Sequence, residues 1–480
     1  MIPNLSPSKL VSGRRGGSPG RTIVLIAALL IVFLGTAAWG ATEPQAPPEP
    51  FAQVVEHKLS NGLTLLLLKE SRAPLVTIQV WYRVGSINEA LGKTGLSHLT
   101  EHLMFKGTEK YGPKTFSRSV QKAGGSDNAF TSRDYTGYFE IGPKSELKRW
   151  LEMEADRMTG LKVAEDAFTT EQKVVLEERR LRTEDDPVSS LVEETMAMTF
   201  KAHPYEWPII GWFEDIKSLS REDFLKHYQT YYRPNNCILV VVGDIEPPEV
   251  IKQVEATFGV LPRGPEPPKV TAQEPPQRGE RRVMLHREAQ LPFVIMAYHA
   301  PNYEDKDAYA LELLSLILAQ GRSSRLYHDL VYTQRLALDV GADYEMHSIS
   351  PGVFTIYGQP LPGKTAAEVE AALEVEVAQL QKEPVSEVEL AKAKNQTEAG
   401  FYMSMDSIYF RGRLLGQLAT VAKWTLIREF IPQIRRVTRE DVQRVARKYL
   451  VKENRTVGIL KPIKTGKPGH EKYRPGGQID

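Results

Sequence analysis

Three residues with a fixed spacing are the first candidates for chemistry in this chain. His98 and His102 stand four residues apart, and Glu101 directly precedes the second histidine. Thr94 is a candidate N-cap and Gly107 a candidate stop, so we expect a helix of about three turns with both imidazoles on one face. Two imidazoles at this spacing can bind one zinc ion, and a carboxylate beside them can take a proton from zinc-bound water. The pattern predicts a zinc hydrolase centre with Glu101 as its general base.

A zinc site of this kind needs a third ligand, and a second predicted helix offers two candidates. This helix begins near Thr170 and places Glu171 and Glu178 seven residues apart, two turns along one face. Either carboxylate could reach the metal while the other orients a histidine. The charged residues around them are also typical of a solvated helix face, so spacing alone does not choose between these roles.

The elements that must position these residues mix strands and helices. Asn61-Gly62 occupies a hairpin position within 59–69, and the β-branched and aromatic run 76–82 predicts a further strand. Helical patterns follow at 95–106, 144–158 and 171–182. Because strands and helices do not alternate strictly, as they would in a doubly wound parallel sheet, we expect an α+β fold.

The chain is long enough for two domains, and its halves resemble each other. Its 480 residues are 41% hydrophobic, and single cores usually stop growing at roughly 250–300 residues. The proline-rich segment 261–282 predicts an extended linker between domains at 51–260 and 283–465. The motif Arg221-Glu222-Asp223 recurs as Arg439-Glu440-Asp441, and the strands that follow share the same offset of 218 residues. A constant offset indicates a duplicated α/β domain.

Charge and cysteine content exclude several classes of site and partner. Lys plus Arg number 61 against 60 for Asp plus Glu, so the net charge of +1 indicates neither nucleic acid nor an anionic membrane surface as a partner. The only cysteine, Cys237, begins an apolar run that predicts a buried strand with an inert thiol. An intrachain disulfide and a cysteine-based zinc site are both excluded.

The N-terminal segment has the layout of an export signal. Arginines precede an apolar stretch at 23–34, and the small residues after it suit cleavage. We predict that 1–41 is a cleaved signal peptide or, because 23–41 is just long enough to span a bilayer, an uncut membrane tether. The protein is expected in a bacterial periplasm, soluble or tethered to the inner membrane, with 42–50 as a proline-rich spacer and 466–480 as a flexible tail.

Beyond these features, the chain from 51 to 462 resembles the pitrilysin or insulinase family of inverted-motif zinc peptidases, most closely the branch of mitochondrial processing peptidase and its bacterial relatives. Several short motifs carry the resemblance in addition to the histidine motif. They are Gly95-Leu96-Ser97, Phe105-Lys106-Gly107-Thr108, Gly124-Gly125, Asn128-Ala129-Phe130-Thr131, Asp134-Tyr135-Thr136, the helix 171–178, His203-Pro204-Tyr205, Tyr232-Arg233-Pro234-Asn235-Asn236 and Val242-Gly243-Asp244.

The resemblance implies one Zn²⁺ per chain, with Glu178 as the third ligand and Glu171 as a carboxylate that supports catalysis. It also implies that Asn128 to Thr131 form an edge strand that pairs with the backbone of an extended substrate. The family fold is two homologous α/β domains that face each other across a clamshell chamber, which admits peptides or unfolded segments. Asn128 and Asp134 also fit ordinary turn residues beside the neighbouring glycines.

One departure from the family concerns the second domain. Family members that work alone carry an Arg and, seven residues later, a Tyr that polarise the substrate carbonyl, whereas this sequence has Val331 and Leu338. Neither side chain can donate a hydrogen bond, and loss of one such donor typically lowers the rate by about 10²–10³. Arg322 and Arg325 are nearby substitutes, although salt bridges are their more ordinary role.

This departure leaves three functions open. The first is a zinc metalloendopeptidase that forms the zinc-bearing subunit of a heterodimer, whose homologous sister chain supplies the Arg and Tyr. The second is a non-catalytic scaffold or assembly subunit of the same fold, against which the complete set of metal-site residues argues. The third is a self-sufficient homodimeric peptidase that finds its carbonyl donor elsewhere.

Overall fold

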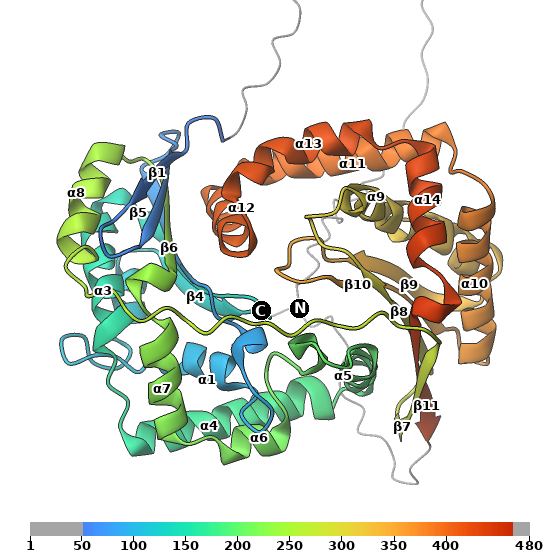
Figure 1. Ribbon diagram of the computed structural model, residues 1–480, viewed down its shortest axis with the longest axis horizontal. Helices are drawn as coiled ribbons and strands as arrows, with labels where there is room; N and C mark the ends of the chain where they lie inside the picture. Colours follow the sequence, from blue (N-terminus) through green and yellow to red (C-terminus); the bar gives the residue numbers. More distant parts are fainter. Residues whose placement is uncertain (1–50, 464–480) are drawn as a thin grey trace, which may run out of the picture. The chain divides into compact units, whose positions relative to one another are not determined.

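The computed structural model describes residues 51–463, which form two β-sheets covered by helices (Figure 1). Strands and helices are mixed in both halves, so the predicted α+β class is confirmed. All described residues belong to one compact unit. The predicted segments 1–41, 42–50 and 466–480 lie outside the described residues. Within 51–463, every helix is too short or too polar to cross a bilayer.

The first sheet has six strands in the order β1-β2-β6-β3-β5-β4. Strands β2 and β6 are parallel, and the other neighbours are antiparallel. The predicted hairpin at Asn61-Gly62 joins β1 to β2, and Gly62 has a φ of 98°, a conformation that favours glycine. The strands are β1 (Val55–Lys58), β2 (Thr64–Lys69), β3 (Leu75–Tyr82), β4 (Ser126–Thr131), β5 (Thr136–Pro143) and β6 (Cys237–Gly243).

Helices from the same half build a core on one face of this sheet. Strand β6 is wholly buried, as its apolar run predicts, and burial raises the pKa of the Cys237 thiol. The helices of this half are α1 (Leu96–Leu103), α2 (Thr115–Lys122), α3 (Leu147–Gly160), α4 (Glu165–Arg179), α5 (Pro187–Thr199), α6 (Phe213–Ser218), α7 (Arg221–Tyr231) and α8 (Pro247–Thr257).

The second sheet has five strands in the order β7-β11-β8-β10-β9 and carries a separate core. Its strands are β7 (Arg281–Glu288), β8 (Phe293–Ala300), β9 (Ala337–Tyr344), β10 (Gly352–Pro360) and β11 (Arg455–Ile463). Its helices are α9 (Asp307–Ala319), α10 (Ala366–Lys382), α11 (Glu387–Ser404), α12 (Ile408–Val421), α13 (Ile427–Arg436) and α14 (Arg439–Tyr449).

The internal repeat appears in the structure at the offset of 218 residues. Helix α7 and strand β6 of the first half correspond to α14 and β11 of the second half. Equivalent bonds recur as well, because the Asn236 side chain donates to the Tyr231 carbonyl at 2.9 Å and the Asn454 side chain donates to the Tyr449 carbonyl at 2.9 Å. The parallel pair β2–β6 likewise has a counterpart in β7–β11.

One helix from each half packs against the sheet of the other half. Helix α5 packs on β7, β8 and β11, whereas α12 packs on β3 and β6. The α12 contact is close, because a Cβ added at Gly416 would overlap the Trp81 indole, and the Gln79 side chain donates to the Tyr409 carbonyl at 2.9 Å. This exchange explains why both sheets belong to one compact unit, an arrangement that the repeat alone does not predict.

The proline-rich segment has an extended course between the halves. Residues 262–278 contain no helix or strand, but Arg281 and Arg282, placed in the linker from the sequence, are the first residues of β7. The segment is fixed by Glu274, whose carboxylate accepts hydrogen bonds from the backbone N–H groups of Lys201 and Ala202 at 2.9 Å.

Candidate metal site

The structure brings the two histidines of α1 next to Glu178 of α4. One nitrogen of His98, one nitrogen of His102 and one carboxylate oxygen of Glu178 all lie within 4.8 Å of one another. The Nε2 atom of His98 is 3.8 Å from Glu178 Oε1, and Nε2 of His102 is 3.2 Å from Glu178 Oε2. Two imidazoles and one carboxylate that converge in this way form a donor set suited to zinc.

The protonation states of the histidines also fit a cation at this position. Burial lowers the pKa of His98 to about 4, so its imidazole is neutral and can act as a ligand. Burial also disfavours the charged form of His102, but hydrogen bonds to Glu171 and Glu178 outweigh this and raise its pKa to about 9. The carboxylates of Glu171 and Glu178 therefore stabilise the proton on His102, and a divalent cation bound at the same place can supply this positive charge instead.

Helix α1 is shorter than predicted and begins differently. It has eight residues instead of about three turns, and its N-cap is Gly95, not Thr94. Gly95 has a φ of 85°, and the Glu89 carboxylate accepts hydrogen bonds from the backbone N–H groups of Gly95 (2.7 Å) and Ser97 (2.6 Å). The Thr94 hydroxyl instead donates to Asp215 at 2.7 Å. A cap supplied by a side chain outside the helix replaces the predicted local cap.

Helix α4 positions both candidate carboxylates and begins at Glu165, five residues before the predicted start. It is anchored beside α6 by the Gln172 amide, which donates to the Ile216 carbonyl at 2.8 Å and to the Leu219 carbonyl at 2.9 Å. After Arg179 the helix continues as a π-helix over Arg180–Glu184. Glu178 therefore lies two residues before a change in helix type, and π-turns of this kind often occur at functional sites.

The two carboxylates that spacing alone could not distinguish occupy different places. Glu178 lies beside Nε2 of both histidines, whereas Glu171 lies 3.0 Å from Nδ1 of His102. Glu171 also forms an ion pair with Lys106, a contact that the sequence did not predict. Burial raises the pKa of Glu171, but the hydrogen bonds from His102 and Lys106 outweigh it and the net shift is downward. Glu171 therefore stays ionised and orients His102 from the side opposite to Glu178.

Glu101 lies between the candidate metal ligands and the edge of the first sheet. Its Oε2 atom accepts a hydrogen bond of 2.5 Å from the hydroxyl of Thr131, the last residue of β4. Burial raises the pKa of Glu101 above its usual value, although the bond from Thr131 opposes the shift. A raised pKa makes the ionised carboxylate of Glu101 a stronger proton acceptor than an ordinary glutamate.

The segment Asn128–Thr131 lies in β4, an edge strand as expected, because β4 pairs only with β5 in the described sheet. Phe130 packs edge-on against Trp81 with ring centroids 5.0 Å apart, whereas Thr131 contacts Glu101. The side chains of the strand thus alternate between the two sheet faces. The outer side of β4 pairs with no other strand of the described sheet, and the Ala129 N–H donates to the Asn128 side chain at 2.9 Å.

Asp134 lies in the turn between β4 and β5, as the turn interpretation expects, and its buried side chain also links the two halves. Its carboxylate accepts a hydrogen bond from the Tyr205 hydroxyl at 2.6 Å and one from the backbone N–H of Ile349 at 3.0 Å. Burial raises the pKa of Asp134 to about 6, and these two hydrogen bonds oppose the shift. Tyr205 belongs to the His203-Pro204-Tyr205 motif, which thereby helps to join the halves.

The positions of the absent Arg and Tyr carry apolar side chains that cannot donate hydrogen bonds. Val331 is half-buried in a π-helix (Tyr327–Thr333), and Leu338 is exposed in β9. Arg325 donates to both carboxylate oxygens of Glu389, at 2.6 and 3.0 Å, so its ordinary role in a salt bridge is confirmed. The sequence did not identify Arg182, whose Nη1 atom is 2.8 Å from Glu178 Oε1.

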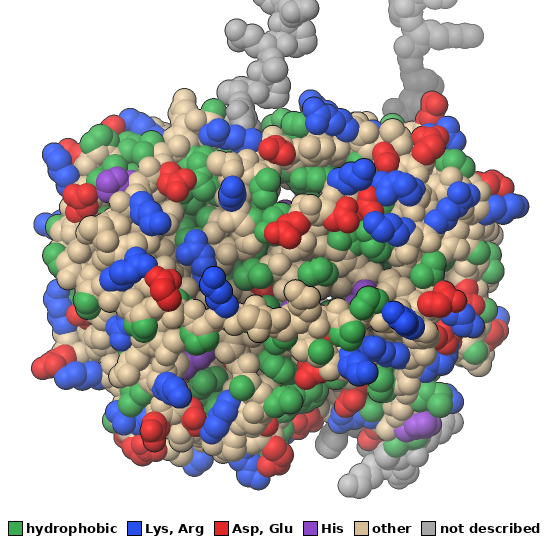
Figure 2. Space-filling model, viewed as in Figure 1, with side chains coloured by type: hydrophobic (Ala, Val, Ile, Leu, Met, Phe, Trp, Pro, Cys, Tyr) green, Lys and Arg blue, Asp and Glu red, His purple; other side chains and the backbone are tan. Residues whose placement is uncertain are grey.

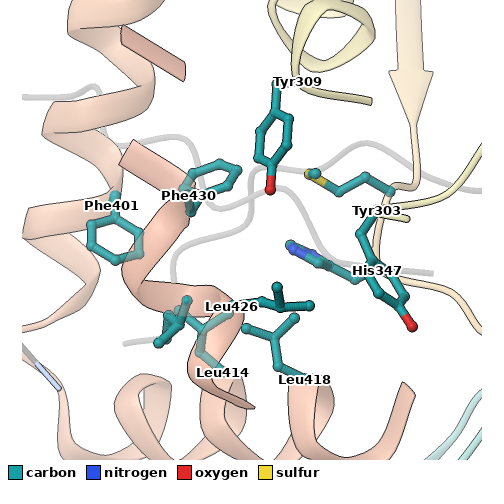
Figure 3. Close-up of a pocket in the computed structure, with 10 residues that line it drawn as sticks. Tyr303, Tyr309, His347, Phe401, Leu414, Leu418, Leu426 and Phe430 are labelled. Atoms are coloured by element: carbon teal, nitrogen blue, oxygen red, sulfur yellow. The ribbon is translucent and has the colours of Figure 1, made fainter. Parts of the chain in front are cut away.

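A separate apolar cavity of about 50 Å³ lies in the second half, where aromatic and aliphatic side chains from α9, α11, α12 and α13 converge (Figure 3). Burial lowers the pKa of its one imidazole, His347, to about 4. The cavity shares no residue with the metal site. Its walls are formed by Tyr303, Tyr309, Met346, His347, Phe401, Leu414, Leu418, Leu426, Ile427 and Phe430.

On the surface, positive and negative side chains are interspersed across the face seen in Figure 2, in keeping with the net charge of +1. This face therefore presents no broad field of one sign that would select a polyanionic partner.

Comparison with known proteins places these residues in a family. Residues 65–211 match the model described as Insulinase (Peptidase family M16), and residues 218–397 match the model described as Peptidase M16 inactive domain. The chain is 32% identical over 408 residues to a Helicobacter pylori protein named zinc protease PqqE, covering 84% of this chain and 92% of that protein. It is 26% identical over 428 residues to the probable mitochondrial-processing peptidase subunit beta of Arabidopsis thaliana, covering 87% of this chain and 80% of that protein.

A solved structure gives the same result. The crystal structure of a protease from Helicobacter pylori superposes with a TM-score of 0.83 at 31% identity, covering 85% of this chain and 99% of that chain. The matched models, the coverage of the relatives and the shared fold agree with the resemblance found in the motifs. This chain belongs to the insulinase family of peptidases, family M16.

Proposed function

We propose that this protein is a zinc-dependent endopeptidase that hydrolyses peptides or unfolded polypeptide segments. The observation that carries the proposal is the convergence of His98, His102 and Glu178 within 4.8 Å, with Glu101 next to them and beside an open sheet edge. His98, His102 and Glu178 would hold one Zn²⁺ per chain. Bound zinc would polarise the substrate carbonyl and lower the pKa of a coordinated water to about 7.

Other residues of the chain transfer the proton, orient His102 and bind the substrate backbone. Glu101 takes the proton of the attacking water and delivers it to the leaving amine, while Thr131 fixes the orientation of its carboxylate. Glu171 and Lys106 fix His102 through its Nδ1 side. Strand β4 pairs with the extended substrate, so that peptide N–H and C=O groups are satisfied while the scissile bond crosses the site.

The location and surroundings of the site belong to the same proposal. We propose that 1–41 directs export to a bacterial periplasm, as a cleaved signal or as a tether through 23–41, and that substrates enter a chamber between domains at 51–260 and 283–465. Size and backbone pairing would then select the substrate more than any single side chain.

Val331 and Leu338 favour a second arrangement, in which a homologous sister chain supplies the carbonyl donors. The same two residues fit a scaffold subunit without activity. Copurification followed by a hydrolysis assay distinguishes these arrangements. A heterodimer should hydrolyse peptides only when a second chain is present, whereas a self-sufficient enzyme should do so alone. A scaffold should show no hydrolysis with or without a second chain.

The proposed activity is tested by zinc content and by hydrolysis of an unstructured peptide library. Glu101→Gln should keep zinc at about one per chain and lose hydrolysis, because it removes the base and leaves the ligands. Glu178→Gln should lose both. Glu177→Gln is the matched control, since Glu177 is exposed on the same helix and pairs with Arg180. Absence of zinc from the unaltered chain would overturn the proposal.

A further inference from the structure

An exposed arginine contacts one residue of the candidate metal site. Arg182 lies in the π-helix that follows α4, and its guanidinium contacts Glu178 at 2.8 Å. Its side chain is 66% exposed, against 16% for Glu178. The guanidinium is therefore much more accessible to solvent, and to a bound ligand, than the carboxylate that it contacts.

The neighbouring arginines on this segment are occupied by other partners. Arg179 is buried and bonds to Glu193 at 2.7 Å, while Arg180 pairs with Glu177 at 2.5 Å and with Asp185 at 2.6 Å. Within the described part of the chain, Glu178 is the single ion-pair partner of Arg182. Since a guanidinium has five N–H donors, most of those on Arg182 remain available to a ligand.

The charge of Arg182 acts on His98, Glu101 and Glu178. It lowers the pKa values of His98, Glu101 and Glu178, although for His98 and Glu101 burial has the larger effect and for Glu178 the hydrogen bond from His102 does. Arg182 thus lies near a metal ligand on each helix and near the proposed base. A cation in this position would also attract negative charge that develops on a bound substrate.

Hydrogen-bond donors beside the metal speed peptide hydrolysis, and the chain lacks the two that the family resemblance leads us to expect. When water adds to the carbonyl carbon, negative charge moves onto the carbonyl oxygen and must be stabilised. Val331 and Leu338 cannot donate to it, and Arg325 is bound to Glu389. Among the residues described around Glu178, Arg182 has a side chain that is exposed and that has N–H groups available to donate further hydrogen bonds.

We infer that Arg182 binds the carbonyl oxygen of the scissile peptide bond and stabilises the negative charge that forms there. The inference rests on the proposed peptidase function. The carbon–oxygen bond to water forms, the carbon–nitrogen bond breaks, and the water proton passes through Glu101 to the amine. Arg182 keeps its own proton throughout. The donor is then supplied within one chain, and no sister subunit is needed for the chemistry.

The test compares Arg182→Ala with Arg180→Ala, a matched loss of an exposed arginine from the same π-helix. Arg182→Ala should lower kcat by about 10²–10³ with KM nearly unchanged, because the contact forms chiefly in the transition state. Zinc content should stay at the level of the unaltered chain. Added guanidinium ion at millimolar concentration should restore part of the lost kcat, since it can occupy the vacated place, and it should not stimulate Arg180→Ala.

The contrary results separate a failure of the inference about Arg182 from a failure of the proposed function. Loss of zinc from Arg182→Ala would show that Arg182 only positions Glu178 for the metal. A raised KM with unchanged kcat would show that Arg182 contributes only to binding of the substrate in its ground state. Either result would overturn the inference. A zinc-loaded unaltered chain that is inactive without a second chain also overturns it. An unaltered chain without zinc contradicts the proposed function itself.

Discussion

The Thr131 hydroxyl donates a hydrogen bond of 2.5 Å to Glu101, and this bond couples the edge strand to the helix that carries both histidines. The strand proposed to hold the substrate and the carboxylate proposed to move the proton are therefore in direct contact. Any shift of β4 that follows substrate pairing would reach the base through this bond.

Replacing Thr131 by Val should move the pH profile of the enzyme. The hydrogen bond lowers the pKa of Glu101, so its loss should raise that pKa further. Because the base must be ionised, the acidic limb of kcat/KM should move to higher pH by the same amount. Thr131→Ser keeps the hydroxyl and should restore the original profile. An unchanged limb in Thr131→Val would contradict the role of this bond.

Replacing Glu171 by Gln should weaken zinc binding without removing a ligand. Glu171 orients His102 through Nδ1, and loss of such a partner typically lowers metal affinity by about 10–100-fold. Competition with a chelator measures the change, and Glu178→Gln should lose much more affinity in the same assay. Equal losses in the two variants would mean that both carboxylates are ligands.

Zinc uptake by the metal-free chain should depend on pH. His102 has a pKa of about 9 without metal, so it is protonated at neutral pH and must lose its proton to bind zinc. Affinity should therefore fall as the pH drops below about 9, and binding at pH 7 should release about one proton. Calorimetry in two buffers with different ionisation enthalpies measures this release. Binding without proton release would contradict the raised pKa.

The link at Asp134 should make stability depend on pH in the acidic range. Burial raises its pKa from the ordinary 3.8 to about 6, so the folded state favours the protonated form. Its contribution to stability is complete below about pH 3.8 and is lost as the pH rises through about 6. Thermal unfolding of Asp134→Asn should lack this part of the dependence. Parallel profiles for the variant and the unaltered chain would contradict it.

The convergence of the candidate metal ligands was largely predictable because its pattern is local. Helix periodicity places His98 and His102 on one face, and two turns of α4 place Glu171 and Glu178 together. The choice between those carboxylates came from the family resemblance, and the structure then separated their positions. Arg182 was missed because an arginine in a charged helix has no signal in the sequence that distinguishes it from a solvated residue.

Features that depend on distant contacts were predicted less well. The cap of α1 comes from Glu89 and a left-handed Gly95, so the local preference of Thr94 for an N-cap was misleading. The exchange of α5 and α12 between the halves arises from packing across the molecule. Composition and periodicity do not say which sheet a helix covers.

Anomalous X-ray diffraction at the zinc absorption edge, on crystals of the zinc-loaded chain, tests the central claim most directly. The account predicts one peak per chain, at about 2.0–2.2 Å from Nε2 of His98, Nε2 of His102 and a carboxylate oxygen of Glu178. A peak at any other group of residues, or crystals of active protein without a zinc peak, would contradict it.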